Sequence, residues 1–298
     1  MNMREQVREL MRGASDLHIH AGPDIVPRRQ DLVEVARDAR EAGMRALGIK
    51  DHNTNTAGRC YVASQLVPGI ELLGGIVLNH TVGGLNPEAV DKAIQLGTKI
   101  IWMPSVDAEL TIQKVHVTHE TPWLEGWVKR TDPKEGLSIF KGGMEGNEIL
   151  PEVRDILKLI AEANVILDTC HLGAREALAL VKEAKGMGVK KIIITHPNCS
   201  VNLMPIDVQK ELAGLGALLS YAFVPCMPLF DRQDFREIAK MINEVGSGNA
   251  IFFTDFGQLP NPSEIEGVRM FISSLLAVGF KEKEVKAITC ENFRRVLD

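Results

Sequence analysis

Short runs of apolar residues alternate with longer amphipathic segments along most of the chain. The short runs have the length and the continuous apolar character of strands buried on both faces of a parallel sheet. The longer segments repeat their apolar positions with the period of a helix. The pattern predicts strand–helix units in series, with strands over residues 16–20, 45–50, 72–78, 99–103, 165–169, 191–195, 217–223 and 250–254.

Turn and capping residues mark the ends of the predicted helices. Gly43 follows the helix expected over residues 31–42, and Pro87 occupies the first helical position after Asn86. After an opening amphipathic helix that ends near Gly13, further helices are expected over residues 58–67, 86–96, 150–163, 175–185, 205–215, 231–245, 264–278 and 283–297.

The alternation of predicted strands and helices is interrupted once, over residues 106–146. The segment is polar and glycine-rich, and it contains Trp123, Trp127 and a His116-Val-Thr-His119 sequence. We interpret it as one long insertion with a hairpin near residues 137–140. Long ordered loops beside a catalytic face commonly recognise substrates, so we expect a lid. The two tryptophans are equally compatible with a contact in a homo-oligomer.

Eight such units without a shift in composition favour a single (β/α)8 TIM-type barrel over residues 1–298, with the insertion after strand 4. Eight units of about 30 residues use roughly 240, which leaves room for one large insertion. A doubly wound open sheet is the alternative. It usually carries a glycine-rich first turn, and no G-x-G-x-x-G follows any predicted strand.

Composition narrows the classes of partner. The chain is 45% hydrophobic and 24% charged, as globular proteins are, and its net charge of −5 gives no broad attraction to nucleic acid or anionic lipid. The longest apolar stretch, residues 217–230, is interrupted by prolines and too short to span a bilayer. A charged N-terminus and five scattered cysteines predict a reducing, cytoplasmic location. A small-molecule partner is therefore expected.

The histidines carry the strongest functional signal. Six of the eight lie at or just past the carboxyl end of a predicted strand: His18, His20, His52, His80, His171 and His196. In a parallel barrel that edge carries the active site. The other two lie in the insertion.

His18 and His20 are one residue apart on a strand, so both side chains face the barrel mouth. His171, His196 and Asp255 end three later strands. Four imidazoles and a carboxylate at one rim suit a divalent cation, most simply Zn2+, with Mn2+, Fe2+ or Ni2+ as alternatives. Such a cation activates water, and Asp255 is placed to take its proton.

Two neighbouring strand ends add further candidates. Lys50, Asp51 and His52 end the second strand, and His80 follows the third. Lys50 and His52 are candidates for binding an anionic or carbonyl oxygen, and His52 with His80 for a second metal site. The alternative is a capping Asp51 with solvated neighbours.

The ordered set of His-x-His, two later histidines and a final aspartate resembles the amidohydrolase superfamily of metal-dependent barrel hydrolases. The resemblance implies that His18, His20, His171 and Asp255 hold the metal. His196 then completes the ligand set or hydrogen-bonds the attacking water or the substrate carbonyl. The resemblance also implies cleavage of a C–N, ester or lactone bond.

Many two-metal members of the superfamily carry a bridging Lys or Glu at the end of strand four, where this chain reads Trp102-Met-Pro-Ser105. The resemblance therefore favours one metal, unless His52 and His80 build a second site.

The first 60 residues are also similar to the polymerase-and-histidinol-phosphatase family, through the segments at residues 16–20, 42–44 and 50–54. That likeness implies a multinuclear phosphoesterase, but strand three ends in Asn79-His80 rather than a glutamate. Two further hypotheses are a decarboxylase built on an amidohydrolase-like barrel and a barrel that binds metal without turnover.

Overall fold

The computed structural model describes residues 2–298, and its centre is a ring of parallel strands. Eight strands follow one another in chain order, and each is hydrogen-bonded to the next. The strands are β1 (Ser15–Ile19), β2 (Ala46–Ile49), β3 (Glu71–Val77), β4 (Ile100–Trp102), β5 (Ile166–Asp168), β6 (Ile192–Thr195), β7 (Leu218–Ala222) and β8 (Ala250–Phe253). The predicted (β/α)8 barrel is confirmed, and the open-sheet alternative is excluded.

The ring closes between β8 and β1, just past the regular strands. Asp255 N–H donates to His18 O over 3.1 Å, and His20 N–H donates to Phe256 O over 2.8 Å. Gly257 follows with a φ of 132°, and a Cβ there would overlap with the carbonyl oxygen of His20. Only glycine permits this close approach of the two chain segments. The closure therefore places Asp255 directly beside the His18–His20 pair.

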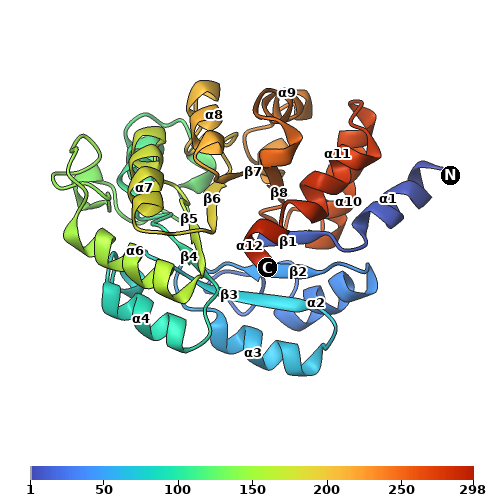
Figure 1. Cartoon of the computed structure of the whole chain (residues 1–298), viewed down its shortest axis with the longest axis horizontal. Helices are drawn as coiled ribbons and strands as arrows, with labels where there is room; N and C mark the ends of the chain where they lie inside the picture. Colours follow the sequence, from blue (N-terminus) through green and yellow to red (C-terminus); the bar gives the residue numbers. More distant parts are fainter. Residues whose placement is uncertain (1) are drawn as a thin grey trace.

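Helices surround the strands on the outside of the ring, and α1 packs against α10 beside the chain's amino end (Figure 1). The helices are α1 (Met3–Met11), α2 (Leu32–Glu41), α3 (Ala57–Leu66), α4 (Pro87–Gln95), α5 (Glu109–His116), α6 (Pro151–Ala163), α7 (Ala174–Gly186), α8 (Ile206–Gly214), α9 (Phe235–Val245), α10 (Glu264–Ala277), α11 (Glu282–Lys286) and α12 (Arg294–Leu297).

Local sequence explains the helix ends. Asp31 caps α2 by accepting from the backbone of Val33 and Glu34, and Gly43 follows in the left-handed region with a φ of 77°. The predicted single helix over residues 283–297 is wrong in one respect. A π-helical turn, Ala287–Glu291, separates α11 from α12.

The insertion after β4 is more ordered than its polar composition predicts. It contains α5 and two short 3₁₀ turns, Pro122–Leu124 and Pro133–Glu135. In place of the expected hairpin near residues 137–140 there are two isolated bridges, a parallel one between Ala108 and Leu137 and an antiparallel one between Phe140 and Ile149. Apolar side chains of the insertion form a second, smaller core with the loop after β6: Val106, Ile112, Val115, Leu124, Val128, Cys199 and Val201. This core holds the first 3₁₀ turn beside the carboxyl edge of the barrel.

Within residues 2–298, no helix combines the length and the apolar character needed to cross a membrane.

Candidate active site

Three potential metal ligands meet where β1 and β8 end. One nitrogen of His18, one of His20 and one carboxylate oxygen of Asp255 all lie within 4.8 Å of one another. Asp255 Oδ1 is 3.4 Å from His18 Nε2 and 3.2 Å from His20 Nε2. His18 lies in β1 and His20 directly after it, and both side chains face the same site, as their spacing predicts. Two imidazoles and a carboxylate this close together form a donor set that fits a divalent cation.

The environment of His18 supports that fit. The ring is 0% exposed, and Lys50 Nζ donates to its Nε2 over 3.0 Å. Because Nε2 accepts this bond, it presents no hydrogen to Asp255 Oδ1, so two acceptors face each other. Nδ1 carries the remaining proton and has no hydrogen-bond partner among residues 2–298. A nearby positive charge relieves this repulsion, and Lys50 supplies one at His18 Nε2.

His196 lies across the barrel mouth with its tautomer fixed by Asn202. His196 Nδ1 is 2.7 Å from Asn202 Oδ1. The amide nitrogen of Asn202 donates to the carbonyl oxygens of Cys170 and Thr195, so its oxygen must be the acceptor. His196 therefore donates from Nδ1 and leaves the lone pair of Nε2 available for a ligand.

His171 and His52 complete the ring of imidazoles. His171 Nδ1 is 3.1 Å from Thr111 Oγ1 on α5, and its ring centroid is 5.1 Å from that of His196. His52 Nδ1 is 2.8 Å from Ser105 Oγ, and its ring stacks on that of His20 with centroids 4.9 Å apart. The insertion thus supplies a partner that orients a site histidine.

Arg28 is a site residue that the sequence analysis missed. It lies in the loop after β1, and its side chain is almost wholly buried against Asp24, with 2.7 Å between Nη2 and Oδ2. Arg28 Nη2 also donates to His20 Nδ1 over 3.2 Å, and the guanidinium carbon lies 4.8 Å from the ring centroid of Trp127. No local pattern marks a loop arginine of this kind.

Burial sets the protonation of the imidazoles. It lowers the pKa of four of them well below the ordinary value: His18, His20, His52 and His171. It lowers the pKa of His196 to about 4, although the nearby Asp255 opposes this. Burial raises the pKa of Asp255, against the effect of Lys50. Neutral imidazoles at neutral pH are the form that binds cations.

Backbone strain accompanies these residues. His196 has a φ of 29° and Asp255 a φ of 56°, both in the left-handed region that non-glycine residues rarely adopt. Each costs on the order of 1 kcal/mol or more and persists only where the surroundings impose it. Cys170, which precedes His171 at the end of β5, has a φ of 48°, so the strain recurs at three strand ends beside the pocket.

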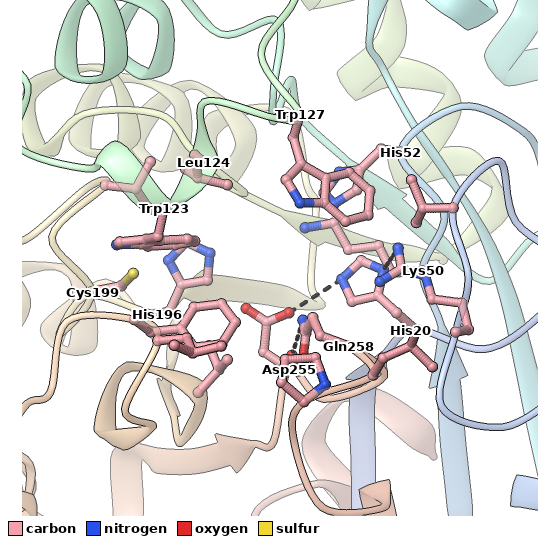
Figure 2. Close-up of a pocket in the computed structure, with 18 of the residues that line it drawn as sticks. His20, Lys50, His52, Trp123, Leu124, Trp127, His196, Cys199, Asp255 and Gln258 are labelled. Carbon is pink, nitrogen blue, oxygen red and sulfur yellow. Dashed lines mark hydrogen bonds and ion pairs between the residues drawn. The ribbon is translucent and has the colours of Figure 1, made fainter.

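His20, His52, His171 and His196 border a cavity of about 340 Å³, and His18 lies buried behind them. Figure 2 shows His20, Lys50, His196 and Asp255 turned toward one space, with Trp123 and Trp127 on its other sides. The polar wall is His20, Arg28, Lys50, His52, His171, His196 and Asp255, and most of the remaining lining is apolar: Val26, Pro27, Trp123, Leu124, Trp127, Val201, Val224, Leu229, Phe230, Leu259 and Pro260. The cavity has the size and the mixed character of a small-molecule site.

The other sequence candidates lie elsewhere. His80 does not line the cavity; its Nε2 lies 3.0 Å from Glu135 O, in the second 3₁₀ turn of the insertion. His116 Nε2 lies 3.2 Å from Val128 O, also within the insertion. The structure thus does not bring His80 to His52, and a shared metal site for that pair gains no support.

The first 3₁₀ turn of the insertion is held over the cavity by one polar contact. Trp123 Nε1 donates to Asp231 Oδ1 over 2.8 Å, and Asp231 also accepts from Ser200. Trp123→Phe removes this bond but keeps the ring beside Phe230, whose centroid is 5.1 Å away. Because a hydrogen bond to a charged acceptor contributes about 1.5–3 kcal/mol, we expect amide exchange over residues 122–128 to accelerate about tenfold or more. Unchanged exchange there, with α6 as the internal reference, would contradict this role.

Sequence and structure comparisons place the barrel among known proteins. A family model described as a family of unknown function (DUF6282) matches residues 13–220. No curated protein matches the sequence. An amidohydrolase from Pseudomonas aeruginosa superposes with a TM-score of 0.67 at 15% identity, covering 100% of this chain and 98% of that one.

Two further structures show the same architecture. The phosphotriesterase homology protein from Escherichia coli, complexed with phosphate in its active site, gives a TM-score of 0.59 at 14% identity over 96% of this chain and 99% of that one. A 5-methylcytosine deaminase from Klebsiella pneumoniae gives 0.58 at 12% identity over 96% and 75%. The resemblance to the amidohydrolase superfamily is thus confirmed for the fold. The resemblance to the polymerase-and-histidinol-phosphatase family gains no support from these comparisons.

Proposed function

The chain belongs to a family of unknown function (DUF6282), and we propose that it is a metal-dependent hydrolase that cleaves a C–N, ester or lactone bond of a small molecule. The observation that carries this proposal is the cluster of His18, His20 and Asp255 donor atoms within 4.8 Å, at the carboxyl edge of a barrel and beside a pocket. That edge is where barrel enzymes place their catalytic groups.

His18, His20 and Asp255 would hold the cation, with His171 and His196 as the further nitrogen donors on the facing rim. When bound, a divalent cation polarises a carbonyl or phosphoryl oxygen and lowers the pKa of water. Zn2+ is the favoured cation because the donors are mostly imidazoles. Asn202 supports this assignment, since it leaves the lone pair of His196 Nε2 unshared.

Side chains of the protein carry out the proton transfer and stabilise the developing charge. Asp255 Oδ2 is not the oxygen shared with the histidines, and as a carboxylate it accepts the proton of the attacking water. Asp255 then returns that proton to the leaving group. Lys50 and His52 donate to the developing negative charge on the substrate oxygen.

The apolar wall gives the pocket its second function, which is to exclude water and position the substrate. Trp123 and Trp127 cover the polar wall from the insertion, and Leu229 and Phe230 extend the cover from the loop after β7. In such a partly desolvated space the charges of Lys50 and Asp255 act more strongly than in water. A small substrate with an apolar body fits this lining.

Elemental mass spectrometry of the untagged protein, purified without chelators, tests the proposal. We expect about one metal ion per wild-type chain and none in His18→Ala/His20→Ala. A pair in the insertion, His116→Ala/His119→Ala, serves as the matched control and should keep its metal. Two or three ions per wild-type chain would favour a multinuclear phosphoesterase. Protein that takes up no metal after incubation with Zn2+ or Mn2+ would overturn the proposal.

A further inference from the structure

Two side-chain cations donate to the imidazoles that would bind the metal. Lys50 Nζ donates to His18 Nε2, and Arg28 Nη2 donates to His20 Nδ1. The Lys50 contact places a positive charge where a bound cation would carry one. The Arg28 contact is different, because it acts on the nitrogen of His20 that faces away from Asp255.

The Arg28 contact fixes the tautomer of His20. A guanidinium only donates, so His20 Nδ1 must accept from it, and the neutral ring then carries its proton on Nε2. That proton is donated to Asp255 Oδ1 over 3.2 Å. A cation on His20 Nε2 needs the opposite tautomer, with the proton on Nδ1. Nδ1–H and the Arg28 N–H would then face each other, so the guanidinium must give up this contact.

Arg28 keeps an anchor when it does so. Nε donates to Asp24 Oδ2 over 2.7 Å, and the guanidinium lies on the face of Trp127. Nη1 has no hydrogen-bond partner among the described residues 2–298, and Arg28 lines the cavity. The guanidinium thus has unused N–H donors at the edge of the pocket. Its hydrogen bond to Asp24 and its contact with the Trp127 ring hold it there.

We propose that Arg28 recognises a carboxylate on the substrate, and that binding of the divalent cation at His20 frees its guanidinium for that contact. The inference rests on the proposed function for the cation alone. It adds the substrate class, which is a small molecule that carries a carboxylate next to an aromatic or branched apolar body.

The charges around the pocket agree with an anionic ligand. Lys50 and Arg28 balance Asp24 and Asp255, and imidazoles that bind a cation are neutral. A divalent cation therefore makes the loaded pocket net positive. The apolar side chains that line the cavity, including Leu229 and Phe230, take the body of the ligand.

Isothermal titration calorimetry with phenylacetate as the probe tests this, with phenylacetamide as its uncharged counterpart. Each is titrated into metal-free and Zn2+-loaded protein. The test variant is Asp24→Asn/Arg28→Met, which removes both charges and so leaves no uncompensated buried carboxylate. The matched control is Arg154→Met/Glu183→Gln, which removes the ion pair between α6 and α7, joined over 2.6 Å and distant from the pocket lining.

We expect phenylacetate to bind the Zn2+-loaded wild type at least tenfold more tightly than the metal-free protein, with phenylacetamide weak in both. The test variant should lose at least tenfold in phenylacetate affinity while binding Zn2+ no more weakly than wild type. The control variant should match wild type.

Three results would overturn the inference and leave the proposed function standing. They are wild-type phenylacetate affinity in the test variant, no phenylacetate binding to the Zn2+-loaded wild type, and equal binding with and without Zn2+. The first of these would place the carboxylate on the cation instead of Arg28. A wild-type protein that binds no Zn2+ would overturn the proposed function as well.

Discussion

Asp255→Asn should lower kcat/KM for hydrolysis of 4-nitrophenyl acetate by the Zn2+-loaded protein at least 1,000-fold, on the order of the contribution of a positioned general base together with a lost ligand. Asparagine keeps the shape of the side chain but can neither take a proton from water nor carry the negative charge that His18 and His20 face. The ester is small enough for a cavity of about 340 Å³.

Metal content and a surface variant make this result interpretable. Asp234→Asn removes an exposed carboxylate that pairs with Arg236, and it should hydrolyse the ester as wild type does. If Asp255→Asn retains its metal, the loss reports proton transfer; if it loses the metal too, it reports ligation. A variant that keeps a tenth or more of wild-type activity would show that Asp255 has neither role.

The barrel was predictable because its signal is repetitive and local. Each buried strand appears as a short apolar run, and each helix carries its own capping residues, such as Asp31 and Gly43. The break in the last helix was not predictable, because tertiary contacts produce it. Asn292 donates to Ser247 O and Ala250 O beside the π-helical turn, over 2.7 Å in each case. Such contacts leave no mark in the periodicity of the helix.

The site was predictable as far as strand geometry determines it. The one-residue spacing of His18 and His20 fixes their common face, and the ends of β6 and β8 bring His196 and Asp255 to the same rim. His80 also follows a strand, but Asp107 Oδ2 accepts from its backbone N–H, and a short 3₁₀ turn begins there. Its ring is thereby directed to the insertion, and not to the pocket.

Residues that act on the imidazoles from loops gave no signal. Asn202 and Arg28 belong to irregular segments after β6 and β1, and their roles depend on hydrogen bonds to residues of other segments or on buried partners. Asparagine and arginine are ordinary loop residues, so their type carries little information. The metal-ligating side chains at the strand ends could therefore be predicted from the sequence. The loop residues that fix the tautomers of the imidazoles and the charge around them could not.

Glu264→Gln should stabilise the protein by about 3 kcal/mol at pH 8 and change its stability little at pH 4.5. Glu264 opens α10 and is 0% exposed, and neither of its carboxylate oxygens has a hydrogen-bond partner in another residue of the described range 2–298. Burial, reinforced by the charge of Asp16, raises the pKa of Glu264 from 4.5 to about 7. The charged form is thus held in the fold without compensation.

The direction of the pH dependence follows from that raised pKa. Below about pH 4.5 the carboxyl is protonated in both the folded and the unfolded chain, so the penalty is absent. Between pH 4.5 and about 7 the unfolded chain releases the proton while the folded chain retains it, and the free energy of unfolding falls. Above pH 7 the loss is complete, and at about 1.4 kcal/mol per pKa unit it amounts to roughly 3 kcal/mol.

Urea unfolding at pH 4.5, 6 and 8 measures this, with Glu266→Gln as the control. Glu266 lies on the same helix but is exposed and paired with Arg269, so its removal should shift stability by less than about 1 kcal/mol at every pH. Asp16, whose pKa burial also raises to about 7, should leave a residual slope in the Glu264→Gln variant. Glutamine matches the shape of glutamate but adds amide N–H donors, whose cost is the same at every pH. A variant whose stability relative to wild type does not rise between pH 4.5 and pH 8 would mean that the Glu264 carboxylate is stabilised in the fold.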